Sequence, residues 1–281
     1  MRHSDRVLLI DRRPVGAGRA ALRAFRGLPV SARVHAAVRW WSAPLPPVEG
    51  ALPPAGRVLE IGCGHGLFSA FAALSGARPG GARSVVGVDI DADKIALAQR
   101  MAANLTAVDL TFRVAESGAV PAGPWDAIVI VDVLYLLPAD AQRSLLAEAA
   151  AQLAPDGVLL IKEMSPTPRW KARWNRWQET MAVSVLGITE RDTGPDAVEP
   201  FAFVDPVTMA GWLGDQGLWT ARQRLDRRRL HPHHLLLARR SDPGVVVTAG
   251  RGASAGAAGH SVRQESPGSV DPADRAIEGC R

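Results

Sequence analysis

The sequence predicts an α/β fold in which helices cover both faces of a doubly wound, mostly parallel sheet of seven strands. Two observations predict it. From residue 57 onward, short and nearly continuous apolar runs alternate with segments of helical spacing, a pattern typical of strands that are buried on both faces. The first apolar run ends in a cluster of glycines that leads directly into a helical segment, as in many open sheets that bind a ligand.

The composition is that of a globular protein and excludes several other classes. The 281 residues are 47% hydrophobic and 22% charged, which is enough apolar surface to exclude disorder throughout. The longest uncharged apolar runs, 127–131 and 133–137, are far shorter than the ~20 residues of a membrane-spanning helix. The N-terminal apolar stretch, 7–10, is too short for a secretory signal, so a cytoplasmic location is expected. Two cysteines do not predict a disulfide framework.

Residues 1–54 are expected to form an N-terminal helical extension and a proline-rich linker. Helical spacing runs from Arg19 to Trp41 and places apolar residues on one face: Val30, Val34, Ala37, Val38 and Trp41. A second stripe is basic and contains Arg19, Arg23 and Arg26. Five prolines between residues 44 and 54 then predict the linker.

The main domain is expected over residues 55–240. β-Branched and other apolar residues predict strands at 58–61, 84–90, 108–114, 125–131, 158–162, 218–225 and 233–238. Helices are predicted at 67–74, 92–104, 140–153 and 205–216. The Pro-Asp-Gly sequence at 155–157 and the polar residues 226–229 predict turns.

An insertion at about 165–205 and a C-terminal tail complete the predicted organisation. The insertion places aromatic and apolar residues at helical spacing, namely Trp170, Trp174, Trp177 and Met181, with arginines beside them. We expect this helix to pack on the flank of the sheet, to form a lid over an apolar acceptor, or to present a face to a membrane interface. Residues 241–281 are rich in Gly, Ser, Ala and Pro without an apolar period, which predicts a disordered tail.

Charge is distributed unevenly along the chain. The net charge is 33 − 28 = +5, but residues 1–41 carry nine arginines and two aspartates, whereas residues 57–165 carry eight basic and twelve acidic residues. A bias toward arginine in the composition is one explanation. The functional alternative is a surface that contacts anions, such as the headgroups of a membrane in a peripheral contact, an acidic carrier protein or nucleic acid.

The chemically informative segment is the glycine-rich turn after the first strand. Glu60 is followed by Gly62, Gly64 and Gly66, which let the backbone turn sharply and let a ligand approach where no Cβ intervenes. The spacing G-x-G-x-G differs from the dinucleotide fingerprint G-x-G-x-x-G, which disfavours a dinucleotide-dependent reductase. Asp89 ends the next strand, where a carboxylate can accept hydrogen bonds from both hydroxyls of a ribose.

These motifs resemble those of the class I S-adenosylmethionine-dependent methyltransferases, which have a Rossmann-like fold. The glycine turn and Asp89 match the first two strands of that family. Three later segments also fit, at 115–117, 125–138 and 153–161. The resemblance covers about residues 55–165 and implies that S-adenosyl-L-methionine is the cofactor.

The resemblance also implies roles for individual residues. Glu60 and the three glycines would belong to the cofactor site, with the glycines around the methionine part. Asp89 would bind the ribose, Ile90 would pack on adenine, and Glu116 or the Ser117 backbone would contact the polar edge of adenine. Asp132 would lie near the methionine amino group; the alternative for Asp132 is a helix N-cap.

The catalytic residues stay open at this point. A general base is needed only if the acceptor loses a proton during the attack, and the candidates are His65 and Glu163, each with a purely structural alternative. Tyr135, Trp170 and Trp174 are candidates for the acceptor pocket. No paired carboxylates suggest a metal, so none is expected. His231, His233 and His234 are expected to be surface residues on a terminal strand rather than ligands.

The function most consistent with the sequence is methyl transfer to a small-molecule or lipid acceptor, most simply by an O-methyltransferase of secondary or lipid metabolism, with N- and C-methylation left open. Methylation of RNA or protein is an alternative, which is disfavoured because the fourth strand is followed by Asp-Val-Leu-Tyr and not by Asn/Asp-Pro-Pro-Tyr. Contact with nucleic acid is therefore not expected. A non-catalytic protein that binds a membrane or a partner is a third hypothesis, against which the intact glycine turn and Asp89 argue.

Overall fold

A computed structural model describes residues 14–77, 80–164, 202–225 and 233–240, all within one compact unit that spans residues 1–242. The predicted tail 241–281, most of the predicted insertion, with its three tryptophans, and His231 lie outside the described residues. None of the described helices combines the length and the apolar composition that crossing a bilayer requires.

One seven-stranded sheet forms the centre of the fold, as predicted. Its strands are β1 (Gly56–Ile61), β2 (Arg83–Asp89), β3 (Asp109–Val114), β4 (Trp125–Val131), β5 (Leu153–Met164), β6 (Trp219–Arg224) and β7 (His233–Arg239). They lie in the order β3-β2-β1-β4-β5-β7-β6. The first five strands are parallel, and β7 is antiparallel to both of its neighbours. The sheet is therefore mostly parallel and doubly wound.

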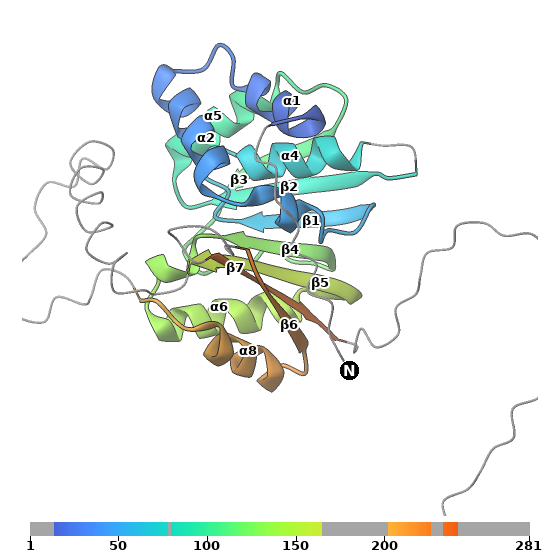
Figure 1. The fold of residues 1–281 in the computed structure, drawn as a ribbon, viewed down its shortest axis with the longest axis vertical. Helices are drawn as coiled ribbons and strands as arrows, with labels where there is room; N and C mark the ends of the chain where they lie inside the picture. The colour runs from blue at the N-terminus through green and yellow to red at the C-terminus, as the bar shows by residue number, and fades with distance from the viewer. Residues whose placement is uncertain (1–13, 78–79, 165–201, 226–232, 241–281) are drawn as a thin grey trace, which may run out of the picture. The chain divides into compact units, whose positions relative to one another are not determined.

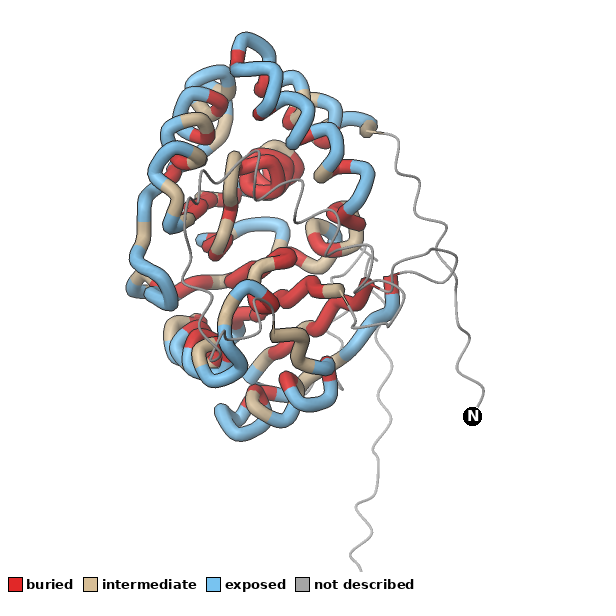
Figure 2. The backbone as a smooth tube through the Cα atoms, turned by 90° about the vertical axis from the view of Figure 1, so that its left-hand side faces the viewer, coloured by how far each residue is buried: buried red, intermediate tan, exposed pale blue. Residues whose placement is uncertain are grey.

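Helices cover both faces of this sheet (Figure 1). On one face lie α1 (Gly16–Ala24), α2 (Val30–Ser42), α4 (Leu67–Gly76) and α5 (Ala92–Ala102); on the other lie α6 (Ala139–Ala151) and α8 (Pro206–Asp215). Two hydrophobic clusters result, one for each face. In Figure 2 the central strands are buried, whereas the outer helices are exposed on their outward side; the edge strands β3 and β6 are largely exposed.

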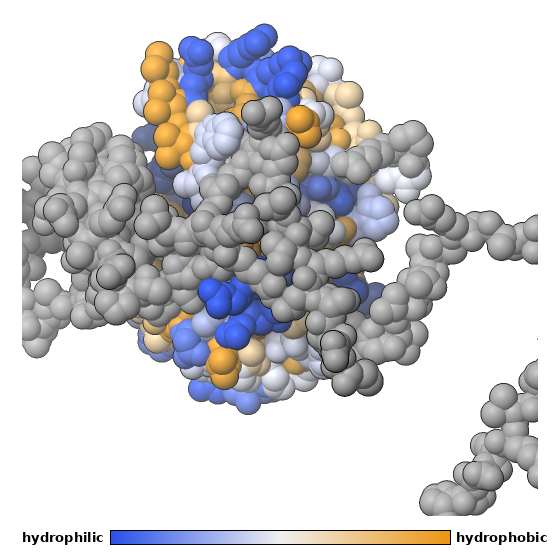
Figure 3. All heavy atoms as spheres, viewed as in Figure 1, coloured by the Kyte–Doolittle hydropathy of each residue, from blue (hydrophilic) through white to orange (hydrophobic). Residues whose placement is uncertain are grey.

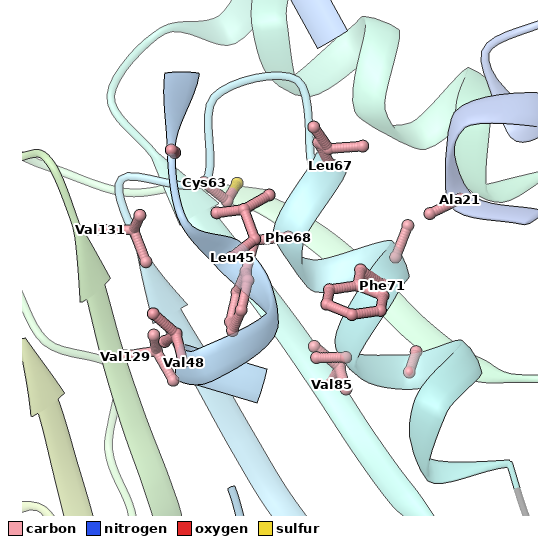
Figure 4. Packing of buried hydrophobic residues seen from close by; sticks show 14 of the residues in the cluster. Ala21, Leu45, Val48, Cys63, Leu67, Phe68, Phe71, Val85, Val129 and Val131 are labelled. Carbon is pink, nitrogen blue, oxygen red and sulfur yellow. The ribbon is translucent and has the colours of Figure 1, made fainter. Parts of the chain in front are cut away.

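The helix that follows the glycine turn, α4, is buried on all sides. Nine of its ten residues are buried, because α4 lies between the sheet and α1. A helix that is apolar all round requires such an environment. Figure 4 shows Phe68 and Phe71 of α4 packed with Val85 and Val129 of the sheet and with Leu45 of the N-terminal segment.

The N-terminal helices share this core. Gly18 of α1 allows the indole ring of Trp40 to lie against the backbone, since a Cβ at Gly18 would be 2.2 Å from a ring carbon. Gly27, with φ +83°, and Pro29 separate α1 from α2 within the segment of predicted helical spacing. The predicted linker contains a further short helix, α3 (Leu45–Glu49), because prolines are tolerated in a first helical turn and Leu45 and Val48 are buried.

Two further details differ from the sequence-based predictions. The turn predicted at 155–157 lies within β5, where the pairing of β4 and β5 shifts register between Trp125 and Ala127. His233 and His234 are on a strand as predicted, but they are buried and not on the surface. The reason is that β7 inserts between β5 and β6 and so is an interior strand.

Candidate functional site

The candidate site lies at the carboxyl ends of β1, β2 and β4. The strand order reverses between β1 and β4: β2 and β3 continue on one side of this pair, and β5 continues on the other. In open α/β sheets a ligand crevice forms at this switch point, beyond the carboxyl ends of the strands. The glycine turn follows β1, Asp89 ends β2, and Asp132 follows β4, so the topology brings the predicted residues together.

The glycines of the turn serve two different purposes. All three have positive φ angles, which are +72° at Gly62, +54° at Gly64 and +80° at Gly66. A Cβ at Gly62 would lie 2.3 Å from Val133, and a Cβ at Gly66 would lie 2.4 Å from Phe112. A Cβ at Gly64 would meet nothing within 4 Å. Gly62 and Gly66 are therefore required by close packing, whereas Gly64 borders open space in which a ligand can approach the backbone.

The Asp89 carboxylate is held in place by the backbone and still has acceptor capacity. Its Oδ2 atom accepts a hydrogen bond of 2.7 Å from the backbone N–H of Gly64, and its Oδ1 atom accepts one of 3.0 Å from the backbone N–H of Asp91. A carboxylate has about four acceptor positions, so each oxygen retains one. These two remaining acceptor positions suit two adjacent hydroxyls, as on a ribose.

An apolar surface lies beside Asp89. Ile90 is 66% exposed, and Val114, which pairs with Asp89 across β2 and β3, is 54% exposed. Such side chains suit the flat face of a base such as adenine. Glu116 and Ser117 follow β3 directly and are both exposed, which leaves their polar groups accessible at the same edge. The glycine turn, Asp89 and this surface together fit an adenosine-containing cofactor.

A buried cluster of charges lies beyond the end of β4. Asp132 accepts hydrogen bonds of 2.6 Å on both oxygens from Lys162 Nζ, and one of 2.8 Å from Arg39. Arg39 also donates to the carbonyl of Val131 at 2.7 Å, which ties α2 to the end of the strand. Burial disfavours the Asp132 carboxylate, but the charges of Lys162 and Arg39 outweigh this and hold its pKa below the usual value. Asp132 is therefore an ion-pair partner and not the helix N-cap that was the alternative.

Arg39 and Lys162 are the site residues that sequence reasoning missed. A signal was present for Lys162, because a lysine that ends the apolar run 158–161 needs a buried partner. Arg39 gave no such signal, since its partner is 93 residues away in the sequence.

Glu163, next to Lys162 on β5, is almost fully buried. Its Oε1 atom accepts hydrogen bonds of 3.0 and 2.9 Å from the backbone N–H groups of Val133 and Leu134, and so holds the segment after β4. Its Oε2 atom is buried without a hydrogen-bond partner among the described residues. Burial, followed by the negative charge of Asp132, raises the pKa of Glu163 to about 8.

His65 lies in the glycine turn and is half-buried. Its ring centroid is 4.7 Å from that of His35 on α2, and its Nδ1 atom has no hydrogen-bond partner among the described residues. Burial and then the charge of Lys94 lower its pKa, which favours the neutral imidazole. The charged groups that act on it are Lys94, Asp91 and Asp89, which lie at the end of β2 and the start of α5.

Two other predicted residues are buried beneath the site. Glu60 accepts a hydrogen bond from the Ser69 hydroxyl of α4, and burial raises its pKa to about 7. Tyr135 lies in the 3₁₀ turn η1 (Leu134–Leu136) and stacks on Phe203 with centroids 5.3 Å apart. Trp170 and Trp174 fall outside the described residues. Within the described ranges, no group of three His, Cys, Asp or Glu side chains is arranged to hold a metal ion.

A family model described as a methyltransferase domain matches residues 34–188, which is more than half of the chain. The chain belongs to this methyltransferase family. The matched region begins within α2 and includes β1 to β5, and so contains the glycine turn, Asp89 and the Asp132 cluster. A methyltransferase assignment is consistent with the sequence-based prediction of S-adenosylmethionine as the cofactor.

Curated relatives of this methyltransferase are named ubiquinone biosynthesis O-methyltransferases. The protein from Xanthomonas axonopodis pv. citri is 27% identical over 221 residues, which cover 68% of this chain and 84% of that protein. The protein from Xanthomonas campestris pv. campestris strain B100 is 28% identical over 147 residues, which cover 46% of this chain and 58% of that protein.

Solved structures share the fold of this methyltransferase at low identity. An O-methyltransferase family protein from Burkholderia thailandensis superposes with a TM-score of 0.56 at 18% identity, covering 82% of this chain and 65% of that one. Magnesium protoporphyrin IX methyltransferase from Synechocystis PCC 6803, with bound SAH, has a TM-score of 0.51 at 20% identity and covers 80% of this chain and 94% of that one. These structures confirm the Rossmann-like methyltransferase fold.

Proposed function

We propose that this methyltransferase transfers a methyl group to a hydroxyl oxygen of a small-molecule or lipid acceptor, with Glu163 as the general base. The observation that carries the oxygen acceptor is the buried Oε2 atom of Glu163, which lacks a partner among the described residues. The names of the curated relatives support the same reaction. Hydroxyl-bearing precursors of ubiquinone are therefore the first acceptors to test, followed by other phenols and hydroxylated lipids.

The cofactor site of the proposed mechanism consists of the glycine turn and the adjacent strand ends. Gly64 allows the cofactor to approach the backbone, Asp89 accepts hydrogen bonds from its ribose, and Ile90 and Val114 pack on its base. Bound S-adenosylmethionine supplies an activated methyl group on a sulfonium sulfur, which becomes a neutral thioether after transfer. Positioning of the acceptor in line with that methyl group then supplies much of the rate.

Glu163 is better placed as the base than His65. It lies at the end of β5 beside Asp132 and the segment after β4, where the acceptor pocket should open, whereas the charged neighbours of His65 are on the ribose side. In the transfer a bond forms between the methyl carbon and the acceptor oxygen, and the hydroxyl proton moves to Glu163 Oε2. A pKa of about 8 suits a base that works near neutral pH.

Glu163→Gln is expected to lower kcat by about 100-fold or more, because the base is lost while the amide oxygen can still accept from Val133 and Leu134. In the wild-type protein kcat should rise with pH up to about 8, whereas the kcat of the variant should not show this rise. Glu148→Gln is the matched control, since Glu148 also accepts a backbone N–H bond but lies on α6. An unchanged kcat in Glu163→Gln would remove Glu163 from the proposed mechanism.

Glu163 should also make stability depend on pH. Its pKa of about 8 in the folded protein is above the value of about 4.3 expected in the unfolded chain. Between these two values the folded state binds more protons, so its stability falls as the pH rises. Thermal melts from pH 5 to pH 8 should show a smaller fall in Tm for Glu163→Gln than for Glu148→Gln.

Asp89→Asn tests the cofactor site. The amide is isosteric, but it loses the negative charge that strengthens hydrogen bonds to a ribose, and we expect binding of S-adenosylhomocysteine to weaken by about 1–3 kcal/mol. Calorimetry measures this change directly. Asp93→Asn, on the exposed first turn of α5, is the control and should bind as the wild type does. Equal affinity of all three proteins would place Asp89 outside the cofactor site.

Two partners of the basic N-terminal flank stay open alongside this reaction. An anionic membrane surface and an acidic carrier protein would both complement the arginines of residues 1–41. Peripheral attachment to a membrane would also bring the enzyme to an apolar acceptor.

A further inference from the structure

The outward face of α2 is unusually apolar for an exposed helix. Val30, Val34, Val38 and Trp41 follow one another at helical spacing and are 68%, 54%, 54% and 53% exposed. The buried face of the same helix consists of the smaller residues Ala32 and Ala36 together with Trp40. The hydrophobic stripe that identified α2 in the sequence therefore points away from the core, so burial within the described part of the fold does not account for it.

A basic rim borders this apolar face. Residues 14–48 contain five arginines and no aspartate or glutamate. Arg39 binds Asp132, but Arg19, Arg23, Arg26 and Arg33 are exposed and have no acidic partner within the described ranges. They surround a groove of about 520 Å³ between α1 and α2, whose apolar lining includes Leu22, Phe25 and Val34. Figure 3 shows hydrophobic and strongly hydrophilic surfaces side by side at the top of the molecule, where these helices lie.

We propose that this α1–α2 face, formed by the four exposed arginines and by Val30, Val34, Val38 and Trp41, docks on an anionic lipid bilayer. A bilayer presents phosphate anions and hydrocarbon in one plane, which matches a row of apolar side chains flanked by arginines. A second copy of the chain fits less well, because a two-fold contact would bring these arginines together without an acidic residue from 14–48 to neutralise them.

The docking face is connected to the methyltransferase site through α2 itself. Arg39, on another side of this helix, donates to Asp132 and to the carbonyl of Val131 at the end of β4. The bilayer would thus lie against the helix that borders the site, which shortens the path of a membrane-dissolved acceptor. This role in delivery rests on the proposed function, whereas docking itself does not.

The test is sedimentation of the full chain with vesicles. We expect the protein to bind vesicles of phosphatidylglycerol and phosphatidylcholine but not vesicles of phosphatidylcholine alone. Replacing Arg23, Arg26 and Arg33 together by glutamine should lower partition into the anionic vesicles on the order of 100-fold, since each arginine near the surface contributes about fivefold. The matched control replaces Arg100, Arg113 and Arg222, which are also exposed, and so carries the same net charge.

A second pair of variants tests the apolar part. Val34→Asp should abolish vesicle binding, whereas Val207→Asp makes the same change at a 70%-exposed valine on α8 and should not. Equal loss in a variant and its control would overturn the proposal, as would vesicle binding that no variant affects. The proposal would also be overturned if the protein formed concentration-dependent dimers that only Val34→Asp abolished. The same holds if an acidic acyl carrier protein bound the protein and vesicles did not. All variants should bind S-adenosylhomocysteine as the wild type does, because the docking face is separate from the proposed cofactor site. Vesicle binding and methyl transfer are measured in separate assays, so failure of one proposal is distinguished from failure of the other.

Discussion

Lys162→Met is expected to lower the free energy of unfolding by about 3–5 kcal/mol, the cost of leaving a buried carboxylate without its main partner. Lys162 is fully buried and bonds both oxygens of Asp132, whose side chain is 2% exposed. Arg39 alone cannot compensate, because it contacts one oxygen and is itself 31% exposed. Equilibrium unfolding in urea measures the change.

The control for this prediction is Lys94→Met. Lys94 pairs with Asp91 at 3.0 Å, but both side chains are about one-third exposed, so its removal should cost less than about 1 kcal/mol. A double variant, Lys162→Met with Asp132→Asn, should recover much of the lost stability, because asparagine tolerates the positive φ of +55° at position 132 and carries no charge. If Lys162→Met were as stable as Lys94→Met, the Asp132 cluster would not be a structural ion pair.

Alanine substitutions in the glycine turn should separate packing from ligand binding. Gly62→Ala is expected to destabilise the fold by about 3 kcal/mol or more, since a strained backbone of about 1–2 kcal/mol adds to the clash with Val133 at 2.3 Å. Gly64→Ala should cost only the backbone strain, because its Cβ would enter open space. Its Cβ should nevertheless obstruct the cofactor and weaken binding of S-adenosylhomocysteine at least tenfold.

Urea unfolding and calorimetry on both variants check this prediction. The expected result is a crossed pattern, in which Gly62→Ala loses mainly stability and Gly64→Ala loses mainly affinity. Normal affinity in a stably folded Gly64→Ala protein would show that no ligand approaches the turn at that position.

Much of the fold was accessible from local sequence patterns. The limits of β4 were predicted as observed, and five other strands differ by one or two residues at their ends, because each is an apolar run bounded by glycine or polar residues. The exception is β5, which begins at Leu153 and not at residue 158, so it includes the predicted turn. The family resemblance rested on the glycine turn, which is a local feature with backbone requirements of its own. The cofactor was predicted on the same basis.

Local patterns did not show which face of a helix is buried. The stripe from Val30 to Trp41 indicated that α2 is a helix, but the residues that α2 buries are Ala32, Ala36 and Trp40. The Trp40 ring lies against Gly18 of α1, and this close approach of the two helices favours small residues beside the ring. The burial of His233 and His234 was missed for a related reason. A strand late in the chain is not necessarily at the edge of the sheet, and β7 lies between β5 and β6.

The sequence by itself determined the strands of the sheet and the glycine turn, and through the family resemblance it indicated methyl transfer, because the motifs concerned consist of residues that are close together along the chain. Only the tertiary structure decided that Arg39 and Lys162 meet at Asp132 and that Glu163 is buried with one oxygen unpartnered among the described residues. It also decided that α2 turns its valines outward. Pairing of charges and choice of buried face depend on contacts between distant segments, and these exist only after the chain has packed.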